Sequence, residues 1–137
     1  MTPDDLARLH AAAFADTRSW TETEFTDLLC SDFSFVEGDD SGFALGRVIA
    51  DEAELLTLAT LPSLRRQGFA RHWLARFEYT AKKRGAATAF LEVAEDNTAA
   101  IALYLSAGYA KTGARSNYYT RTDGLHVGAL IMAKTLP

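Results

Sequence analysis

The chain has 137 residues, of which 48% are hydrophobic and 23% charged, and its formal net charge is -4. This size and composition are typical of one globular domain, so we expect residues 1–137 to form a single domain. The negative charge argues against direct binding of nucleic acid. No apolar run approaches the ~20 residues that cross a bilayer, so we expect no membrane partner. The single Cys30 excludes an internal disulfide, which favours a cytoplasmic location, and its neighbours Leu28 and Leu29 predict a packed thiol.

The N-terminal half reads as two helices followed by three strands. Thr2-Pro3-Asp4-Asp5 has the pattern of an N-cap and a first helical turn, and Thr21 and Glu24 form a capping box. The helices are expected to begin at these positions, and the first extends to about residue 15. Apolar segments bounded by turn residues then predict three strands. These are Phe33–Val36, Phe43–Ala50 and, after an acidic turn at Asp51–Glu54, Leu55–Leu61.

The C-terminal half alternates helices with strands. Trp73, Leu74, Phe77 and Ala81 recur at helical spacing, and Gly85 follows a basic last turn as a C-cap. The order of all elements is ααβββαβαββ. Because a helix connects the third strand to the fourth, these two strands are expected to be parallel and central in a mixed α/β sheet. The elements after this helix are expected to be strand Ala86–Ala94, a helix from Asn97 to Ala107, and strands Ala110–Tyr119 and Leu125–Ala133.

The segment from Leu58 to Arg71 carries the strongest functional signal. An apolar strand leads through Arg65-Arg66-Gln67-Gly68-Phe69-Ala70 directly into a helix. Such a turn points free backbone N–H groups at one spot and adds the positive end of the helix dipole, so it suits a phosphate or pyrophosphate. Gly68 and Ala70 leave room for a bulky anion, and positive charge comes from Arg65, Arg66 and Arg71. The spacing is neither that of a dinucleotide-binding turn nor that of a P-loop.

Glu92 interrupts an apolar strand close to the end at which ligands of parallel strands usually bind. Two interpretations are open: a partly buried general base, or a solvated residue at the end of the strand. Asn97 and Tyr104 follow on one face of the next helix. Asn97 is either a helix cap alone or a ligand contact as well, and Tyr104 is either a core aromatic or a group that faces a ligand.

Together these segments resemble the GNAT acetyltransferases, and more closely the bacterial ribosomal-protein-alanine N-acetyltransferases (the RimI type). The resemblance implies a GNAT-like, mostly antiparallel sheet with flanking helices, in which a central parallel strand pair splays apart. It extends from about Leu55 to Lys134. The motifs that carry it are Arg65-Arg66-Gln67-Gly68-Phe69-Ala70, Leu91-Glu92-Val93, Asn97-Thr98-Ala99-Ala100-Ile101-Ala102-Leu103-Tyr104 and Arg115-Ser116-Asn117-Tyr118-Tyr119.

The resemblance also implies an activity, the acetyl-CoA-dependent acetylation of a protein N-terminal α-amine. The implied acceptor is a small-subunit ribosomal protein with N-terminal alanine. By the same resemblance Glu92 is the general base and Tyr104 the general acid, and Tyr118 or Tyr119 touches the acceptor. The implied acetyl-CoA contacts are the backbone of Leu58, Ala59 and Thr60 with the pantetheine arm, the amides of Arg66, Gln67, Gly68, Phe69, Ala70 and Arg71 with the pyrophosphate, and Asn97 farther along.

Two other functions stay open. The acceptor could be a lysine side chain or a small amine, although a lysine amine costs ~4–5 kcal/mol to deprotonate at neutral pH, against ~1 kcal/mol for an α-amine. The chain could also be a non-catalytic acyl-CoA-binding module, which would need the anion-binding turn but neither Glu92 nor Tyr104. Its three histidines are scattered without metal-ligand spacing, so no metal is expected.

Overall fold

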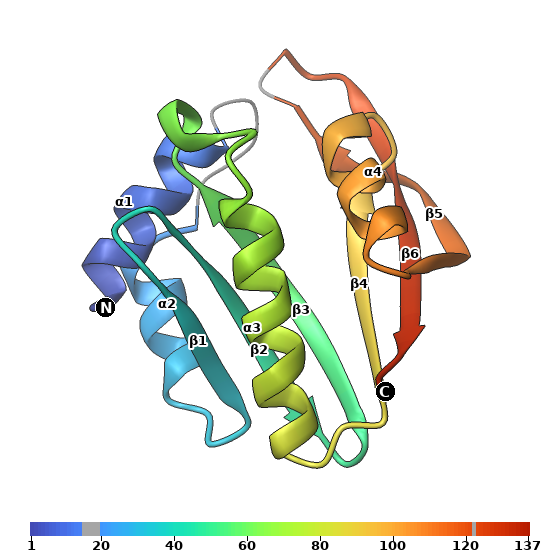
Figure 1. Cartoon of the computed structure of the whole chain (residues 1–137). Coiled ribbons are helices and arrows are strands. Elements are labelled where there is room, and N and C mark those ends of the chain that lie inside the picture. The colour runs from blue at the N-terminus through green and yellow to red at the C-terminus, as the bar shows by residue number, and fades with distance from the viewer. Residues whose placement is uncertain (15–19, 122) are drawn as a thin grey trace.

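The computed structural model describes residues 1–14, 20–121 and 123–137 (Figure 1). The order of its elements confirms the predicted ααβββαβαββ. Its helices are α1 (Pro3–Ala13), α2 (Glu22–Leu29), α3 (Phe69–Lys83) and α4 (Thr98–Ser106), with a short 3-10 helix at Pro62–Leu64. Its strands are β1 (Ser34–Asp39), β2 (Gly42–Ile49), β3 (Glu52–Thr60), β4 (Thr88–Ala94), β5 (Ala110–Thr120) and β6 (His126–Thr135).

Side-chain caps determine where three of the helices begin. Thr2 and Asp5 form a capping box at α1, and Thr21 and Glu24 form another at α2. Each cap of this kind stabilises a helix by ~1 kcal/mol. Asn97 caps α4, whereas α3 begins without a side-chain cap. α1 ends at Ala13, and the expected helix end at about residue 15 lies outside the described residues.

The strands form one six-stranded sheet in the order β1-β2-β3-β4-β6-β5. β3 and β4 are parallel, as their helical connection through α3 predicted, and the other neighbouring strands are antiparallel. The expected mixed, mostly antiparallel sheet with a central parallel pair is therefore confirmed.

The central pair separates before either strand ends. The ladder joins Glu52–Leu55 of β3 to Thr88–Leu91 of β4, and in the described strands no pair follows it. β3 nevertheless continues to Thr60 and β4 to Ala94. Figure 1 shows the two strands diverging from the bottom of the sheet toward its top. The splayed pair implied by the resemblance is present.

A β-bulge lies where β3 turns away from β4. Leu45 of β2 opposes Thr57, whereas the next residue of β2, Gly46, opposes Leu55, so Leu56 is the extra residue. A bulge bends its strand and increases the local twist. The end of the β3–β4 ladder at Leu55 therefore coincides with a local change in the direction of β3.

Each face of the sheet carries its own core. α3 and α4 lie on one face, where their apolar residues pack with every second residue of β4, including Leu91 and Val93 (Figure 1). α1 and α2 pack on the other face over β1, β2 and β3, around Phe25, Phe43 and Ala59. None of the members of this second cluster comes from β4, β5 or β6. The sheet thus separates the α3–α4 side from a face that α1 and α2 cover only in part.

Several strand boundaries differ from expectation: β1 continues to Asp39, three residues beyond the expected end, and β4 begins at Thr88, two residues later than expected. β3 begins at Glu52, so the predicted acidic turn through Glu54 is wrong. Glu54 pairs with Arg47 of β2, and their side chains form an ion pair of 2.7 Å. Opposite charges on paired strands stabilise the ladder, which explains how acidic residues begin a strand here. β6 also continues to Thr135, two residues beyond the expected end.

The prediction for Cys30 is wrong as well. Cys30 is the C-cap of α2 and is exposed rather than packed. Its position follows the last helical turn, so the periodicity that buries Phe25 no longer determines which way its side chain points. Within the described residues, the helices are too short or too polar to span a bilayer.

Candidate active site

The sheet register places Glu92, Arg115 and Tyr119 on one face. Paired residues on neighbouring strands share a face, and so do residues two apart along one strand. Since Leu91 and Val93 pack in the α3–α4 core, Glu92 and the two residues of β5 point to the opposite face. The β6 residues that oppose the three are Ile131, Ala129 and Val127, respectively.

Glu92 is held by an ion pair. An Nη atom of Arg115 lies 3.2 Å from a carboxylate oxygen of Glu92. The Glu92 side chain is 19% exposed, and that of Arg115 is 54% exposed. The Glu92 carboxylate is therefore neither buried without a partner nor fully solvated. It is a mostly covered carboxylate with a charged partner that reaches solvent.

Tyr119 and Tyr118 differ in their surroundings. Burial raises the pKa of Tyr119 to about 12, and the negative charge of Glu92 adds to this effect. Tyr118 is 48% exposed, and the Arg115 guanidinium lies over its ring at 5.1 Å from the centroid. Sequence reasoning left the choice between these tyrosines open, and in the structure Tyr119 is the one that interacts with Glu92.

Tyr104 lies on α4, at the side of the sheet opposite to Glu92. It is buried in the α3–α4 core and packs edge-on against Tyr109, with ring centroids 5.9 Å apart. Burial raises its pKa well above the usual tyrosine value, and the nearby Tyr119 phenol raises it further. At neutral pH Tyr104 is therefore a protonated phenol that can donate a hydrogen bond.

A polar network behind Tyr104 was missed by sequence reasoning. The Tyr109 hydroxyl donates to one oxygen of Glu78 at 3.0 Å, and Lys134 donates to the other at 2.7 Å. The network joins α3, the start of β5 and β6. Burial raises the pKa of Tyr109, and the negative charge of Glu78 raises it further. The only sequence signal was a charged residue, Glu78, next to the apolar stripe of α3, which does not reveal its partners.

The turn before α3 presents free amides. Gly68 is the N-cap with φ of 86°, and Arg66 also has a positive φ of 64°. The first intrahelical bond runs from His72 to the Gly68 carbonyl. The N–H groups from Gly68 to Arg71 therefore precede the helical ladder, and no side chain caps them. A Cβ at Gly68 would meet nothing within 4 Å, so the space in front of this turn is open.

Two of the arginines assigned to this turn have protein partners. Arg65 donates to the carbonyl of Ala13 and ties the turn to the end of α1. Arg71 donates to the hydroxyl of Ser106 at 2.7 Å and so links the start of α3 to the end of α4. Asn97 accepts the N–H of Ala100 as an ordinary N-cap, which uses its side-chain oxygen and leaves its amide NH2 group for a ligand.

The diverging end of β3 presents an open backbone edge toward β4. Beyond Leu55 its edge toward β4 lacks a strand partner among the described residues. Unpaired edge groups bind an added peptide-like strand. Thr60, at the end of this segment, is buried, and its hydroxyl is the one buried side-chain polar atom without a partner in the described structure. Leu58 and Thr60 share a face, and Leu58 packs on the α3–α4 core.

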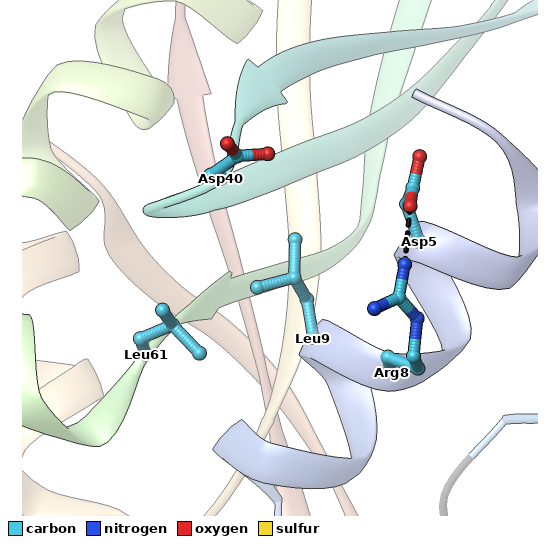
Figure 2. Close-up of a pocket in the computed structure, with 5 residues that line it drawn as sticks. All are labelled: Asp5, Arg8, Leu9, Asp40 and Leu61. Carbon is cyan, nitrogen blue, oxygen red and sulfur yellow. Dashed lines mark hydrogen bonds and ion pairs between the residues drawn. The ribbon is translucent and has the colours of Figure 1, made fainter.

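A surface pocket also lies beside α1, away from the predicted site residues. It is lined by Asp5, Arg8 and Leu9 of α1 together with Asp40 and Leu61 (Figure 2). Arg8 and Asp5, which both line this pocket, form an ion pair with each other, as the dashed line in Figure 2 shows. In the part of the chain that the structure describes, no three potential metal ligands cluster.

Comparisons with known proteins agree with this geometry. The sequence matches the acetyltransferase (GNAT) family model over residues 4–109. It is 38% identical over 136 residues to the ribosomal protein bS18-alanine N-acetyltransferase of Escherichia coli K12, covering 96% of this chain and 91% of that protein. The crystal structure of the E. coli ribosomal-protein-S18-alanine N-acetyltransferase superposes with a TM-score of 0.87 at 34% identity, covering 98% of this chain and 87% of that one. Ard1 from Thermoplasma volcanium shares the fold, with a TM-score of 0.82 at 24% identity and coverage of 100% and 95%.

Proposed function

The chain belongs to the GNAT family of acetyltransferases, and from that membership we propose that it acetylates the N-terminal alanine of a small-subunit ribosomal protein of the S18 type. Acetyl-CoA is the proposed donor, and residues 1–137 act as one catalytic domain. The observation that carries the proposal is the position of Glu92. It is the first residue of β4 beyond the last pair with β3, and it faces away from α3 and α4.

The proposed acetyl-CoA site uses the chain's own unpaired groups. The free amides from Arg66 to Arg71 hold the pyrophosphate at the positive end of α3. The open edge of Leu58, Ala59 and Thr60 pairs with the pantetheine amides, and the buried Thr60 hydroxyl gains the partner that it lacks. This placement brings the thioester to the point where β3 and β4 separate.

Glu92 has a modest task as general base. An α-ammonium has a pKa of about 7.7–8.0, so its deprotonation near neutral pH costs only ~1 kcal/mol. Glu92 accepts this proton, directly or through a water, and the neutral amine attacks the thioester carbonyl carbon. The C–N bond forms as the C–S bond breaks. A positioned base of this kind contributes roughly 10²–10⁴-fold to the rate.

Tyr104 supplies the proton that the departing thiolate needs. At reference values a thiol has a pKa of about 8.5 and a tyrosine about 10, so the transfer is uphill by ~2 kcal/mol. Burial raises the pKa of Tyr104, but it also raises that of a thiol in the same dry surroundings. The phenol therefore acts while the C–S bond breaks, when a hydrogen bond to the developing charge is strongest. Solvent then reprotonates Tyr104.

The acceptor approaches from the face that α1 and α2 leave partly uncovered. Glu92, Arg115 and Tyr119 point to this face, and Tyr118 borders it as an exposed aromatic. The extent of the similarity to the bS18-alanine enzyme, 38% identity over 96% of this chain, supports an N-terminal alanine as acceptor. Ribosomal proteins are made in the cytoplasm, so the proposal places the enzyme there, with no direct nucleic-acid or membrane partner.

Acetyl transfer to a panel of acceptors tests the proposal. The panel holds an S18-type peptide with N-terminal alanine, an N-blocked peptide with one lysine, and spermidine. We expect the first to have a kcat/KM at least roughly 100-fold above the others, because its amine is the least costly to deprotonate. A preference for lysine or spermidine would contradict the proposed acceptor. Binding of acetyl-CoA without any turnover would contradict the enzymatic role.

A further inference from the structure

Arg115 occupies the position next to Glu92 that an acceptor amine must reach. Its guanidinium lies 3.2 Å from the Glu92 carboxylate, on the same face of the sheet. An α-ammonium that gives its proton to Glu92 needs the same carboxylate. In the free protein the Arg115 guanidinium therefore occupies the position that the acceptor's α-ammonium must take.

The local backbone allows this cation to move. Between Arg115 and Tyr119, β5 advances four residues while β6 advances two, from Ala129 to Val127. The extra residues include Asn117, which has a positive φ of 54°. Arg115 thus lies at the edge of a bulge, its side chain is half exposed, and Tyr118 offers its ring to the guanidinium. Because the Arg115 side chain is half exposed, solvent screens this ion pair, so a competing ammonium can displace Arg115 from Glu92.

Building on the proposed function, we infer that Arg115 is a specificity-determining residue that selects N-terminal acceptors. When the acceptor binds, its α-ammonium takes over the contact with Glu92. Arg115, still beside Tyr118, then donates to the carbonyl oxygen of the acceptor's first residue. The Arg115–Glu92 ion pair is exchanged for two contacts with one residue of the acceptor.

The chemistry of the acceptor explains why this exchange is selective. Standard bond lengths place the α-nitrogen and the carbonyl oxygen of one residue about 3 Å apart. A lysine ε-amine and a polyamine have no carbonyl at this distance, so they displace Arg115 without offering it a new acceptor. A hydrogen bond from a charged donor gives the N-terminal acceptor an advantage of roughly 10- to 100-fold.

Arg115→Met tests the inference, because methionine keeps the length of the side chain without its charge or donors. The acceptors are a peptide that begins with alanine and the same peptide beginning with β-alanine, whose carbonyl is one carbon farther from the amine. The KM and kcat are measured for the first, and the second is measured as a competitive inhibitor, which requires no turnover. Lys111→Met, at an exposed position of the same strand, is the matched control.

We expect Arg115→Met to raise the KM of the alanine peptide roughly 10- to 100-fold, with kcat within threefold and an unchanged KM for acetyl-CoA. The inhibition constant of the β-alanine peptide should stay within about twofold, so discrimination between the peptides is lost. Arg115→Lys should recover part of it, and Lys111→Met should behave as wild type. Equal weakening of both peptides, or no change in their ratio, would overturn the inference. Failure of the proposed function is distinct, because it would show as poor turnover of the alanine peptide by the wild-type enzyme.

Discussion

Glu92 and Tyr104 belong to opposite faces of the sheet, yet Tyr119 connects them electrostatically: the Glu92 charge adds to the burial that raises the pKa of Tyr119, and Tyr119 in turn adds to the raised pKa of Tyr104. Glu92 shares its face with Tyr119 through the register of β4, β6 and β5. Tyr104 lies in the core beneath α4, and the pKa values of the two tyrosines reflect burial first and then their charged or phenolic neighbours. The proposed base and acid therefore act from the two sides of the opening between β3 and β4. Their alignment depends on where these strands separate.

Replacement of Tyr104 by phenylalanine should remove the proton donor and keep the packing. We expect kcat to fall roughly 10²–10⁴-fold, with the KM for acetyl-CoA changed by less than about twofold. Steady-state kinetics with the alanine peptide measure both. Unchanged turnover would show that Tyr104 is a packing residue and that the acid is elsewhere.

Tyr109→Phe is a control of equal size in the same core. The variant removes the hydrogen bond to Glu78 but leaves the ion pair with Lys134. We expect a loss of about 1–3 kcal/mol in the free energy of unfolding, because Glu78 is left under-satisfied, and a kcat near that of wild type. Urea unfolding and kinetics separate these effects. A kcat loss as large as that of Tyr104→Phe would mean that both phenols only support the fold of the site.

Glu92→Gln should impair catalysis in a pH-dependent way. At pH 7 most of the acceptor amine is protonated, and the variant lacks the group that removes the proton. At pH 9 the amine is mostly neutral already, so the defect in kcat/KM should shrink by roughly tenfold. The pH–rate profiles of wild type and variant measure this directly. A defect of the same size at both pH values would remove Glu92 from the role of base.

Thr60→Val should change stability and cofactor binding in opposite directions. Valine has the shape of threonine but lacks the buried hydroxyl, which has no partner among the described residues. Without ligand we expect the variant to unfold at a temperature a few degrees higher, from a gain of roughly 1 kcal/mol. The KM for acetyl-CoA should rise about fivefold because the hydroxyl no longer bonds to it. Calorimetry with and without coenzyme A makes the comparison, and unaltered binding would place the cofactor away from Thr60.

Gly68→Ala and Gly85→Ala form a matched pair at the two ends of α3. Both glycines have a positive φ, 86° and 97°, and both have open space where a Cβ would lie. Each substitution should cost about 1 kcal/mol of stability through backbone strain. Only Gly68→Ala should raise the KM for acetyl-CoA, because only that Cβ enters the space in front of the free amides. An equal KM for both variants would argue against pyrophosphate binding at this turn.

The raised pKa of Tyr119, about 12, predicts how stability depends on pH in alkali. In the unfolded chain tyrosine ionises near pH 10, so between pH 10 and 12 the unfolded state binds fewer protons than the folded state. The free energy of unfolding therefore falls as pH rises through this window. Tyr119→Phe should show a shallower fall than wild type in urea unfolding. Parallel falls would mean that Tyr119 is not held in its neutral form by the fold.

Local sequence patterns were sufficient for the order of the elements. The capping pairs at Thr2 and Thr21, the apolar spacing along α3 and the glycine at its end predict structure because each acts within a few residues. The same holds for the turn before α3, since the amides there are free wherever a helix begins without a cap. Together with the motifs around Glu92 and Tyr104, this local information was enough to indicate the family.

The tertiary structure decided what depends on pairing between distant segments. The bulge at Leu56 and the early end of the β3–β4 ladder determine where the sheet opens, and neither has a local signature. The register of β5 on β6 decides that Tyr119, rather than Tyr118, interacts with Glu92, and it brings Arg115 to the same carboxylate. Side chains alternate with a period of two along a strand, so a shift of one residue in register would reverse each assignment. The register of the strands and the point where the sheet opens are therefore determined only in the folded sheet.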